Sequence, residues 1–148
     1  MSKIFIGSDH GGYNLKEKIK EVFSKSGYEF EDVGTNTTES CDYPVYAEKL
    51  AKKVVSENGR GILVCGTGIG MSIAANKFKG IRASHCTDTF SARMTREHND
   101  SNVLCLGERI TGQDLALDIV KIWLDTPFSN GERHVNRINL IKNIENNQ

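Results

Sequence analysis

Short apolar segments alternate with longer amphipathic segments along the whole chain, and this alternation predicts strands followed by helices. The five expected strands are rich in Ile, Val, Leu, Phe or Cys and cover residues 3–8, 28–33, 61–64, 81–86 and 102–106. Apolar residues recur at helical spacing in the intervening ranges 15–23, 42–58, 71–78, 87–98 and 111–123. Five such units predict an α/β protein, a three-layer α/β/α sandwich with a five-stranded parallel Rossmann-like sheet.

A last amphipathic segment, at about 131–146, follows a break in the pattern at residues 127–131. The chain contains no internal repeat, low-complexity tract or linker, so its 148 residues are expected to form one domain, 1–148. Nineteen basic and nineteen acidic residues balance, which argues against nucleic acid or an anionic membrane surface as a partner. No apolar segment approaches membrane-spanning length.

The four cysteines are widely spaced and form no C-x-x-C pair. This pattern fits neither a zinc site nor a disulfide framework, and it indicates a reduced, cytoplasmic protein. Cys65 differs from the others because it opens the glycine-rich stretch 65–70, between an expected strand and an expected helix. Such a turn presents backbone N–H groups and a helix N-terminus, which bind anions without a basic side chain. The same field favours the thiolate form of Cys65.

The spacing of these glycines excludes two familiar motifs. It is neither the dinucleotide fingerprint nor a P-loop, and Met71 stands where a cysteine-dependent phosphatase needs an arginine. A tight strand-to-helix crossover beside a buried cysteine explains the glycines equally well. The glycines alone therefore leave function and structure equally open.

Other polar clusters follow strand ends or lie near helix ends. Asp9-His10 and Gly107-Glu108-Arg109 come directly after strands, and the carboxyl ends of parallel strands meet at one edge of a sheet. His98 lies at the end of an expected helix, where a polar C-cap accounts for it without any catalytic role. Arg133 and Arg137 are spaced i, i+4; most such pairs are merely solvated, although two guanidiniums suit a phosphate dianion.

Jointly, and in this order, the clusters resemble the ribose-5-phosphate isomerase B family of ribose/galactose sugar-phosphate isomerases. The matching motifs are Asp9-His10-Gly11-Gly12, Asp42-Tyr43-Pro44, the run 65–77, His98-Asn99-Asp100, Gly107-Glu108-Arg109 and Arg133-x-x-x-Arg137. The resemblance spans almost the whole chain. It implies an aldose–ketose isomerase of the pentose phosphate pathway that interconverts D-ribose 5-phosphate and D-ribulose 5-phosphate through a cis-enediol(ate), without metal or organic cofactor.

The wider family leaves the substrate open, because it includes allose- and galactose-6-phosphate isomerases. A hexose-6-phosphate isomerase is therefore the alternative enzyme, and a non-catalytic sugar-phosphate or nucleotide-binding module is the alternative of another class. The module would leave the combination of Cys65, Thr67, His98 and Asn99 unexplained.

The resemblance also implies roles for individual residues. Cys65 would be the base, Thr67 would tune it or pass protons to the substrate oxygens, and His98 would open the furanose ring. Asn99 and the backbone N–H groups of the turn would stabilise the developing enediolate oxygen. The expected substrate contacts are Asp9 and Tyr43 for the sugar hydroxyls, Gly66, Gly68, Ile69 and Gly70 in the turn, and His10, Arg109, Arg133 and Arg137 for the phosphate.

The family's active site lies between two subunits. A homodimer with shared active sites is therefore implied, with His98, Asn99 and Arg109 reaching in from the partner chain; a tetramer is allowed. The C-terminal helix, at about 131–146, is expected at the dimer interface. One departure from the family pattern is Glu132, where a glycine is usual. An acidic side chain there would weaken phosphate binding if it pointed inward, and would be harmless if it faced solvent.

Overall fold

The computed structural model describes residues 3–148 and contains a five-stranded sheet in which all strands are parallel. The strands are β1 (Lys3–Ser8), β2 (Glu29–Asp32), β3 (Arg60–Cys65), β4 (Ala83–His85) and β5 (Val103–Gly107), in the spatial order β2-β1-β3-β5-β4. The predicted parallel α/β sheet is confirmed. The strand expected over 81–86 is shorter, because the Ile81 N–H donates to the Phe78 carbonyl in a turn before β4.

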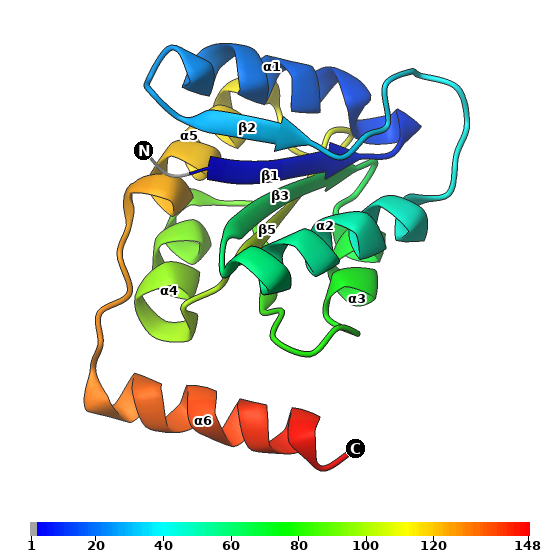
Figure 1. Cartoon of the computed structure of the whole chain (residues 1–148). Coiled ribbons are helices and arrows are strands. Elements are labelled where there is room, and N and C mark those ends of the chain that lie inside the picture. Colours follow the sequence, from blue (N-terminus) through cyan, green and yellow to red (C-terminus); the bar gives the residue numbers. More distant parts are fainter. Residues whose placement is uncertain (1–2) are drawn as a thin grey trace.

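Helices cover both faces of this sheet (Figure 1), which confirms the three-layer sandwich. A short 3₁₀ turn, His10–Gly12, leads into the first helix. The helices are α1 (Tyr13–Ser24), α2 (Tyr43–Glu57), α3 (Ile69–Ala75), α4 (Thr89–Asn99), α5 (Gln113–Asp125) and α6 (Glu132–Asn146). Apolar side chains of α1, α4 and α5 pack on one face, and those of α2 and α3 pack on the other. None of these helices is long and apolar enough to cross a membrane.

The alternation of side chains along β3 decides which face each residue serves. Ile62 and Val64 point into the core under α1 and α5, whereas Leu63 and Cys65 belong to the core under α2 and α3. The last residue of β3 therefore directs its side chain toward α3, the helix that follows it. This orientation places the Cys65 thiol beside the start of that helix.

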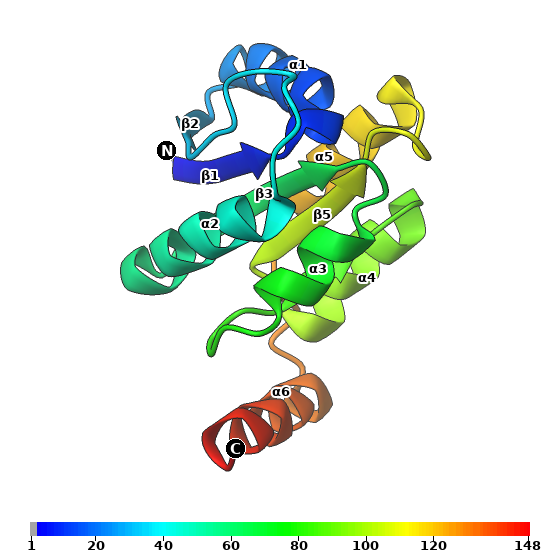
Figure 2. The ribbon, with the colours of Figure 1, turned by 90° about the vertical axis from the view of Figure 1, so that its right-hand side faces the viewer.

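The C-terminal helix α6 stands apart from the sandwich and is joined to it by an extended segment (Figures 1 and 2). Ile138 is the buried residue of α6. Four other apolar side chains of the helix are exposed: Val135, Leu140, Ile141 and Ile144. An amphipathic helix with most of its apolar side chains in water lacks the partner surface that would stabilise it within one chain.

Candidate active site

The turn after β3 holds the Cys65 thiol in a fixed environment. Cys65 is only 5% exposed, and its Sγ accepts a hydrogen bond from the Gly68 N–H at 3.1 Å. Gly68 has φ +83°, a conformation that favours glycine, and α3 begins at the next residue. The thiol of Cys65 is thus held by a backbone donor at the start of a helix.

Two of the expected turn donors are already used within the turn. The Gly68 N–H donates to Cys65, and the Ile69 N–H donates to Thr67 Oγ1 at 3.2 Å. The first N–H groups of a helix have no acceptor inside it, so Gly70 and Met71 present the donors that remain at the start of α3. An oxyanion bound here would thus meet the N–H groups of Gly70 and Met71 rather than those of Gly68 and Ile69.

The loop after β1 lies against the glycine turn. A β-carbon on Gly11 would lie 3.2 Å from the Gly66 nitrogen, so the two loops are in contact. Asp9 Oδ1 accepts from the Gly11 and Gly12 N–H groups at 2.9 and 3.2 Å, which caps the 3₁₀ turn. The second carboxylate oxygen of Asp9 makes no hydrogen bond to residues 3–148, and it is therefore available to a sugar hydroxyl.

His10 has a defined tautomer in this arrangement. The Cys41 N–H donates to His10 Nδ1 at 3.2 Å, so Nδ1 acts as the acceptor and the neutral ring carries its proton on Nε2. An Nε2–H group is a suitable donor to a phosphate oxygen. The position of Cys41 thus explains how His10 can bind an anion without being protonated.

The loop after β5 completes the same edge of the sheet. The Arg109 N–H donates to the Gly66 carbonyl at 2.9 Å, and a β-carbon on Gly66 would lie 3.2 Å from an Arg109 guanidinium nitrogen. The guanidinium therefore lies beside the turn of its own chain, although the resemblance assigns Arg109 to the partner's contribution. Tyr43, the first residue of α2, is also close, because a β-carbon on Gly70 would lie 3.1 Å from its hydroxyl.

A second group of predicted residues lies at the other end of the molecule. His98 and Asn99 end α4, whose 11 residues run back from the carboxyl edge of the sheet over a length of about 16 Å. Arg133 and Arg137 are exposed on α6. The structure thus brings together Asp9, His10, Tyr43, Arg109 and the turn 65–70, but it separates them from His98, Asn99 and the two α6 arginines within one chain.

The connection between α4 and α6 is a stacked pair of histidines. The rings of His98 and His134 lie 4.2 Å apart between centroids and within 12° of parallel. Desolvation, and then the charges of His98, Arg133 and Arg137, lower the pKa of His134 below the ordinary histidine value. The sequence places His134 between two candidate phosphate ligands, but nothing in the sequence predicts this stacking.

Two acidic residues named in the sequence analysis take positions that the sequence left open. The Glu108 carboxylate accepts from the Leu15 N–H at 2.6 Å, so it caps the start of α1 instead of facing the turn. Glu132 is exposed in the first turn of α6, so in this chain its carboxylate faces solvent. Within residues 3–148, no cluster of three His, Cys, Asp or Glu side chains is placed to hold a metal ion.

Two of the remaining cysteines, Cys86 and Cys105, are unsuited to proton transfer. Burial raises the pKa of Cys86 to about 11 and raises that of Cys105 well above its usual range. Cys41 is half-buried next to His10. Cys65 differs from these cysteines because its Sγ accepts a hydrogen bond from the Gly68 N–H in the glycine turn.

Comparison with known proteins identifies the family. The family model described as Ribose/Galactose Isomerase matches residues 4–141. Ribose-5-phosphate isomerase B of Escherichia coli is 47% identical over 146 residues, which are 98% of this chain and 97% of that protein. Among solved structures, ribose-5-phosphate isomerase B of Clostridium thermocellum superposes with a TM-score of 0.95 at 56% identity, covering 98% of each chain.

The Mycoplasma genitalium ribose-5-phosphate isomerase B, solved with bound ribulose-5-phosphate, superposes with a TM-score of 0.94 at 38% identity, covering 99% of this chain and 97% of that one. Sequence and fold therefore agree over nearly the full length of each of these proteins. The chain belongs to the ribose/galactose isomerase family of enzymes.

Proposed function

We propose that this protein interconverts D-ribose 5-phosphate and D-ribulose 5-phosphate, with Cys65 as the base. The observation that carries the proposal is the Cys65 thiol, hydrogen-bonded to the Gly68 N–H in a turn that Asp9 and Arg109 flank. A polar, anion-binding edge with one activated nucleophilic group suits proton transfer on a small phosphorylated sugar.

The proposed reaction moves one proton between two neighbouring carbons. In the open-chain aldose, the Cys65 thiolate takes the proton from C2, and the electron pair forms a cis-enediolate with negative charge on O1. The thiol then returns the proton to C1, while the hydroxyl proton of O2 is transferred to O1 by way of Thr67, which leaves the ketose carbonyl at C2. Backbone N–H groups at the start of α3, together with Asn99, stabilise the charge that exists only in the intermediate.

The substrate must first be opened, because ribose 5-phosphate is mainly a furanose ring. His98 is proposed to transfer the proton between the ring oxygen and the anomeric hydroxyl. The phosphate is proposed to bind the Nε2–H of His10 and the guanidinium groups of Arg109, Arg133 and Arg137. Charge-assisted bonds from guanidinium groups to phosphate are among the strongest polar contacts available to a protein.

A second copy of the chain is proposed to complete the site. Within one chain, Cys65 lies at the carboxyl edge of the sheet, whereas His98 lies at the end of α4 farther from this edge. A single active site is therefore proposed to take His98 and Asn99 from a partner. The exposed apolar residues of α6 offer the surface for such a partner, in agreement with the predicted dimer interface. A symmetric homodimer would then contain two active sites, each with Cys65 from one chain and His98 from the other.

The pathway is proposed from the reaction, and the compartment from the state of the cysteines. Aldose–ketose interconversion of pentose phosphates belongs to the pentose phosphate pathway, which we propose as the setting of this enzyme. The four cysteines are free thiols, as expected in the reducing cytoplasm.

The test measures isomerisation of ribose 5-phosphate, allose 6-phosphate and galactose 6-phosphate by the wild type and by Cys65→Ala. A preference for the pentose, lost in a folded Cys65→Ala variant, supports both the substrate and the base. A preference for a hexose phosphate would leave the mechanism in place and replace the proposed substrate. Binding of the sugar phosphates without any turnover by the wild type would refute the enzymatic proposal.

The shared site has its own test, in which Cys65→Ala and His98→Asn chains, each with strongly reduced activity, are mixed, unfolded and refolded together. In a mixed dimer, one site would carry both substitutions and the other neither. About a quarter of the wild-type activity should therefore return, since half of the dimers are mixed and each has one intact site. No recovery in a preparation that contains mixed dimers would mean that each chain builds its own site.

A further inference from the structure

Several backbone carbonyl groups at the end of α4 accept hydrogen bonds from outside the helix. A helix leaves its last carbonyl groups without partners inside the helix, and they need donors from elsewhere. Here the Glu97 carbonyl accepts from the Ser129 N–H and hydroxyl, and two further carbonyls, of Asn99 and Asp100, accept from Arg82. These carbonyls flank His98 and Asn99, which are the proposed catalytic residues of α4.

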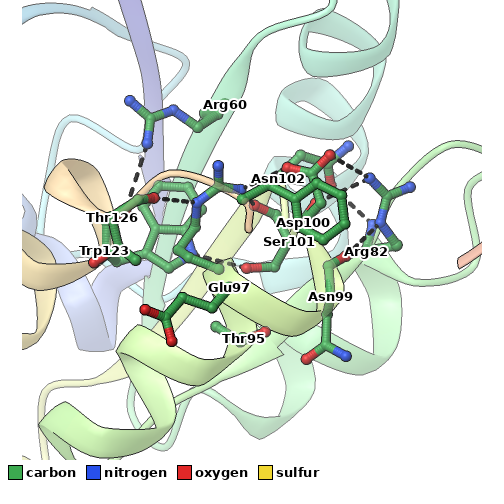
Figure 3. Close-up of polar contacts among 12 residues, drawn as sticks. Arg60, Arg82, Thr95, Glu97, Asn99, Asp100, Ser101, Asn102, Trp123 and Thr126 are labelled. Carbon is green, nitrogen blue, oxygen red and sulfur yellow. Dashed lines mark hydrogen bonds and ion pairs between the residues drawn. The ribbon is translucent and has the colours of Figure 1, made fainter. Parts of the chain in front are cut away.

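Arg82 makes the two bonds that lie nearest to the catalytic pair. Its Nε donates to the Asn99 carbonyl and a terminal nitrogen donates to the Asp100 carbonyl, each at 2.9 Å (Figure 3). The Arg82 side chain is 17% exposed, and the same terminal nitrogen lies 3.6 Å from the Asp100 carboxylate. A planar guanidinium that bonds two successive carbonyls restrains both the position and the direction of the chain.

The other side of the Asp100 turn is held by a buried network. Arg96 donates to the Asp100 carboxylate at 3.0 Å and to the Ser101 carbonyl, and its guanidinium lies 5.8 Å from the centre of the Trp123 ring. Trp123 in turn donates to the Ser101 hydroxyl at 2.9 Å. The residue after Asn99 is therefore fixed from the core side, and Arg82 closes the turn from the other side (Figure 3).

Asp100 itself needs this support. It adopts the left-handed conformation, with φ 45° and ψ 47°, which aspartate tolerates better than most residues but less readily than glycine. Asp100 ends α4, so a loosely held Asp100 would allow the last turn of the helix to fray. A catalytic side chain on a fraying helix end would sample many positions, and displacement by about 1 Å can cost about 100-fold in rate.

We propose that Arg82 is a positioning residue for the isomerisation, which rests on the function proposed above for His98 and Asn99. It touches no substrate; its guanidinium holds the Asn99 and Asp100 carbonyls, so that the imidazole of His98 and the amide of Asn99 keep one orientation toward the partner's Cys65.

The chain offers a matched control for this role. Arg60 donates to the carbonyls of Trp123 and Leu124 at the end of α5, in the way that Arg82 serves α4. The end of α5 carries no proposed site residue. Loss of either arginine should destabilise the fold, because it leaves carbonyl groups at a helix end without donors. Only the loss of Arg82 should also impair catalysis.

The experiment compares kcat and KM for ribose 5-phosphate in the wild type, Arg82→Ala, Arg82→Lys and Arg60→Ala, with unfolding followed by circular dichroism. In Arg82→Ala we expect kcat to fall about 10- to 100-fold while KM changes less than about threefold. Arg82→Lys should have an intermediate kcat, since one ammonium group cannot reproduce the planar fork. Arg60→Ala should keep kcat within about twofold of the wild type despite its lower stability.

A double-mutant cycle tests whether Arg82 acts through His98. In the His98→Asn background, Arg82→Ala should lower kcat by a smaller factor than it does in the wild type, because the two changes affect the same group. Equal factors in both backgrounds, or equal kcat values in Arg82→Ala and Arg60→Ala, would overturn the proposal.

The imidazole resonances of His98 separate this proposal from the proposed function. They should shift and broaden in Arg82→Ala and stay unchanged in Arg60→Ala, whatever substrate the enzyme uses. An inactive wild type would refute the proposed function, whereas unchanged His98 resonances in Arg82→Ala would refute the positioning role.

Discussion

Gly68 gives the sharpest test of how the turn works, because adding one methyl group perturbs it in two separable ways. With φ +83°, Gly68→Ala places a side chain in the left-handed region, which costs about 1–2 kcal/mol of folding free energy. The new β-carbon would also lie 2.9 Å from the Leu106 carbonyl carbon and 2.7 Å from the His85 ring. A clash with the backbone of a central strand adds about 1–3 kcal/mol.

Gly80→Ala is the matched control for this change. Gly80 has a similar φ of +89°, but its β-carbon would meet only the Val55 side chain, at 3.3 Å. We therefore expect a loss of about 2–5 kcal/mol in Gly68→Ala and about 1–2 kcal/mol in Gly80→Ala. Urea unfolding at one protein concentration measures both, with the fluorescence of Trp123, the chain's one tryptophan, as the probe.

The two variants should also differ in catalysis. A displaced Gly68 N–H no longer bonds to Cys65 Sγ, so kcat should fall about 100-fold in Gly68→Ala and stay near the wild-type value in Gly80→Ala. Equal stability losses and equal kcat values in the two variants would refute the argument that the Gly68 backbone holds the thiol.

Three further predictions concern charged groups. Arg137→Ala should raise KM for the phosphorylated sugar about 10-fold or more, because a charge-assisted bond to the phosphate is lost. Lys142→Ala, on the same helix, should leave KM unchanged. Steady-state kinetics at constant ionic strength measures KM for both variants. The pKa of His134 is lowered by desolvation and by neighbouring positive charges, so the unfolded chain binds more protons. Stability should therefore decrease as the pH falls through about 6.5, and NMR titration should find the His134 midpoint below that value. Lys16→Met should lower the free energy of unfolding by about 3 kcal/mol, because the fully buried ammonium bonds to Asp32 at 2.7 Å; acid titration should then find the Asp32 pKa raised.

Much of the fold and part of the site could be predicted from the sequence. Parallel strands end at a common edge, so the residues after β1, β3 and β5 were expected to meet there, and contacts among Gly11, Gly66 and Arg109 confirm it. The bonds within this edge could not be predicted. Gly68 and Ile69 use their N–H groups inside the turn, and Glu108 turns away to cap α1.

The α4–α6 end of the molecule was the least predictable part. His98 was identified by its motif, but its stacking on His134 depends on how the segment after α5 places α6. That segment has no periodic pattern of its own, and its path is set by contacts such as the bonds of Ser129 to the Glu97 carbonyl. Such long-range contacts leave no signal at a fixed spacing in the sequence.

The sequence by itself determined the order of strands and helices and the chemical groups available to the protein. Apolar periodicity and glycine positions act locally, over a few residues, and they suffice to specify these elements. Only the tertiary structure decided which groups share a space. Because the 11 residues of α4 run back along the sheet over about 16 Å, His98 lies at the helix end farther from the edge that holds Cys65. One chain therefore holds the two halves of the proposed site apart.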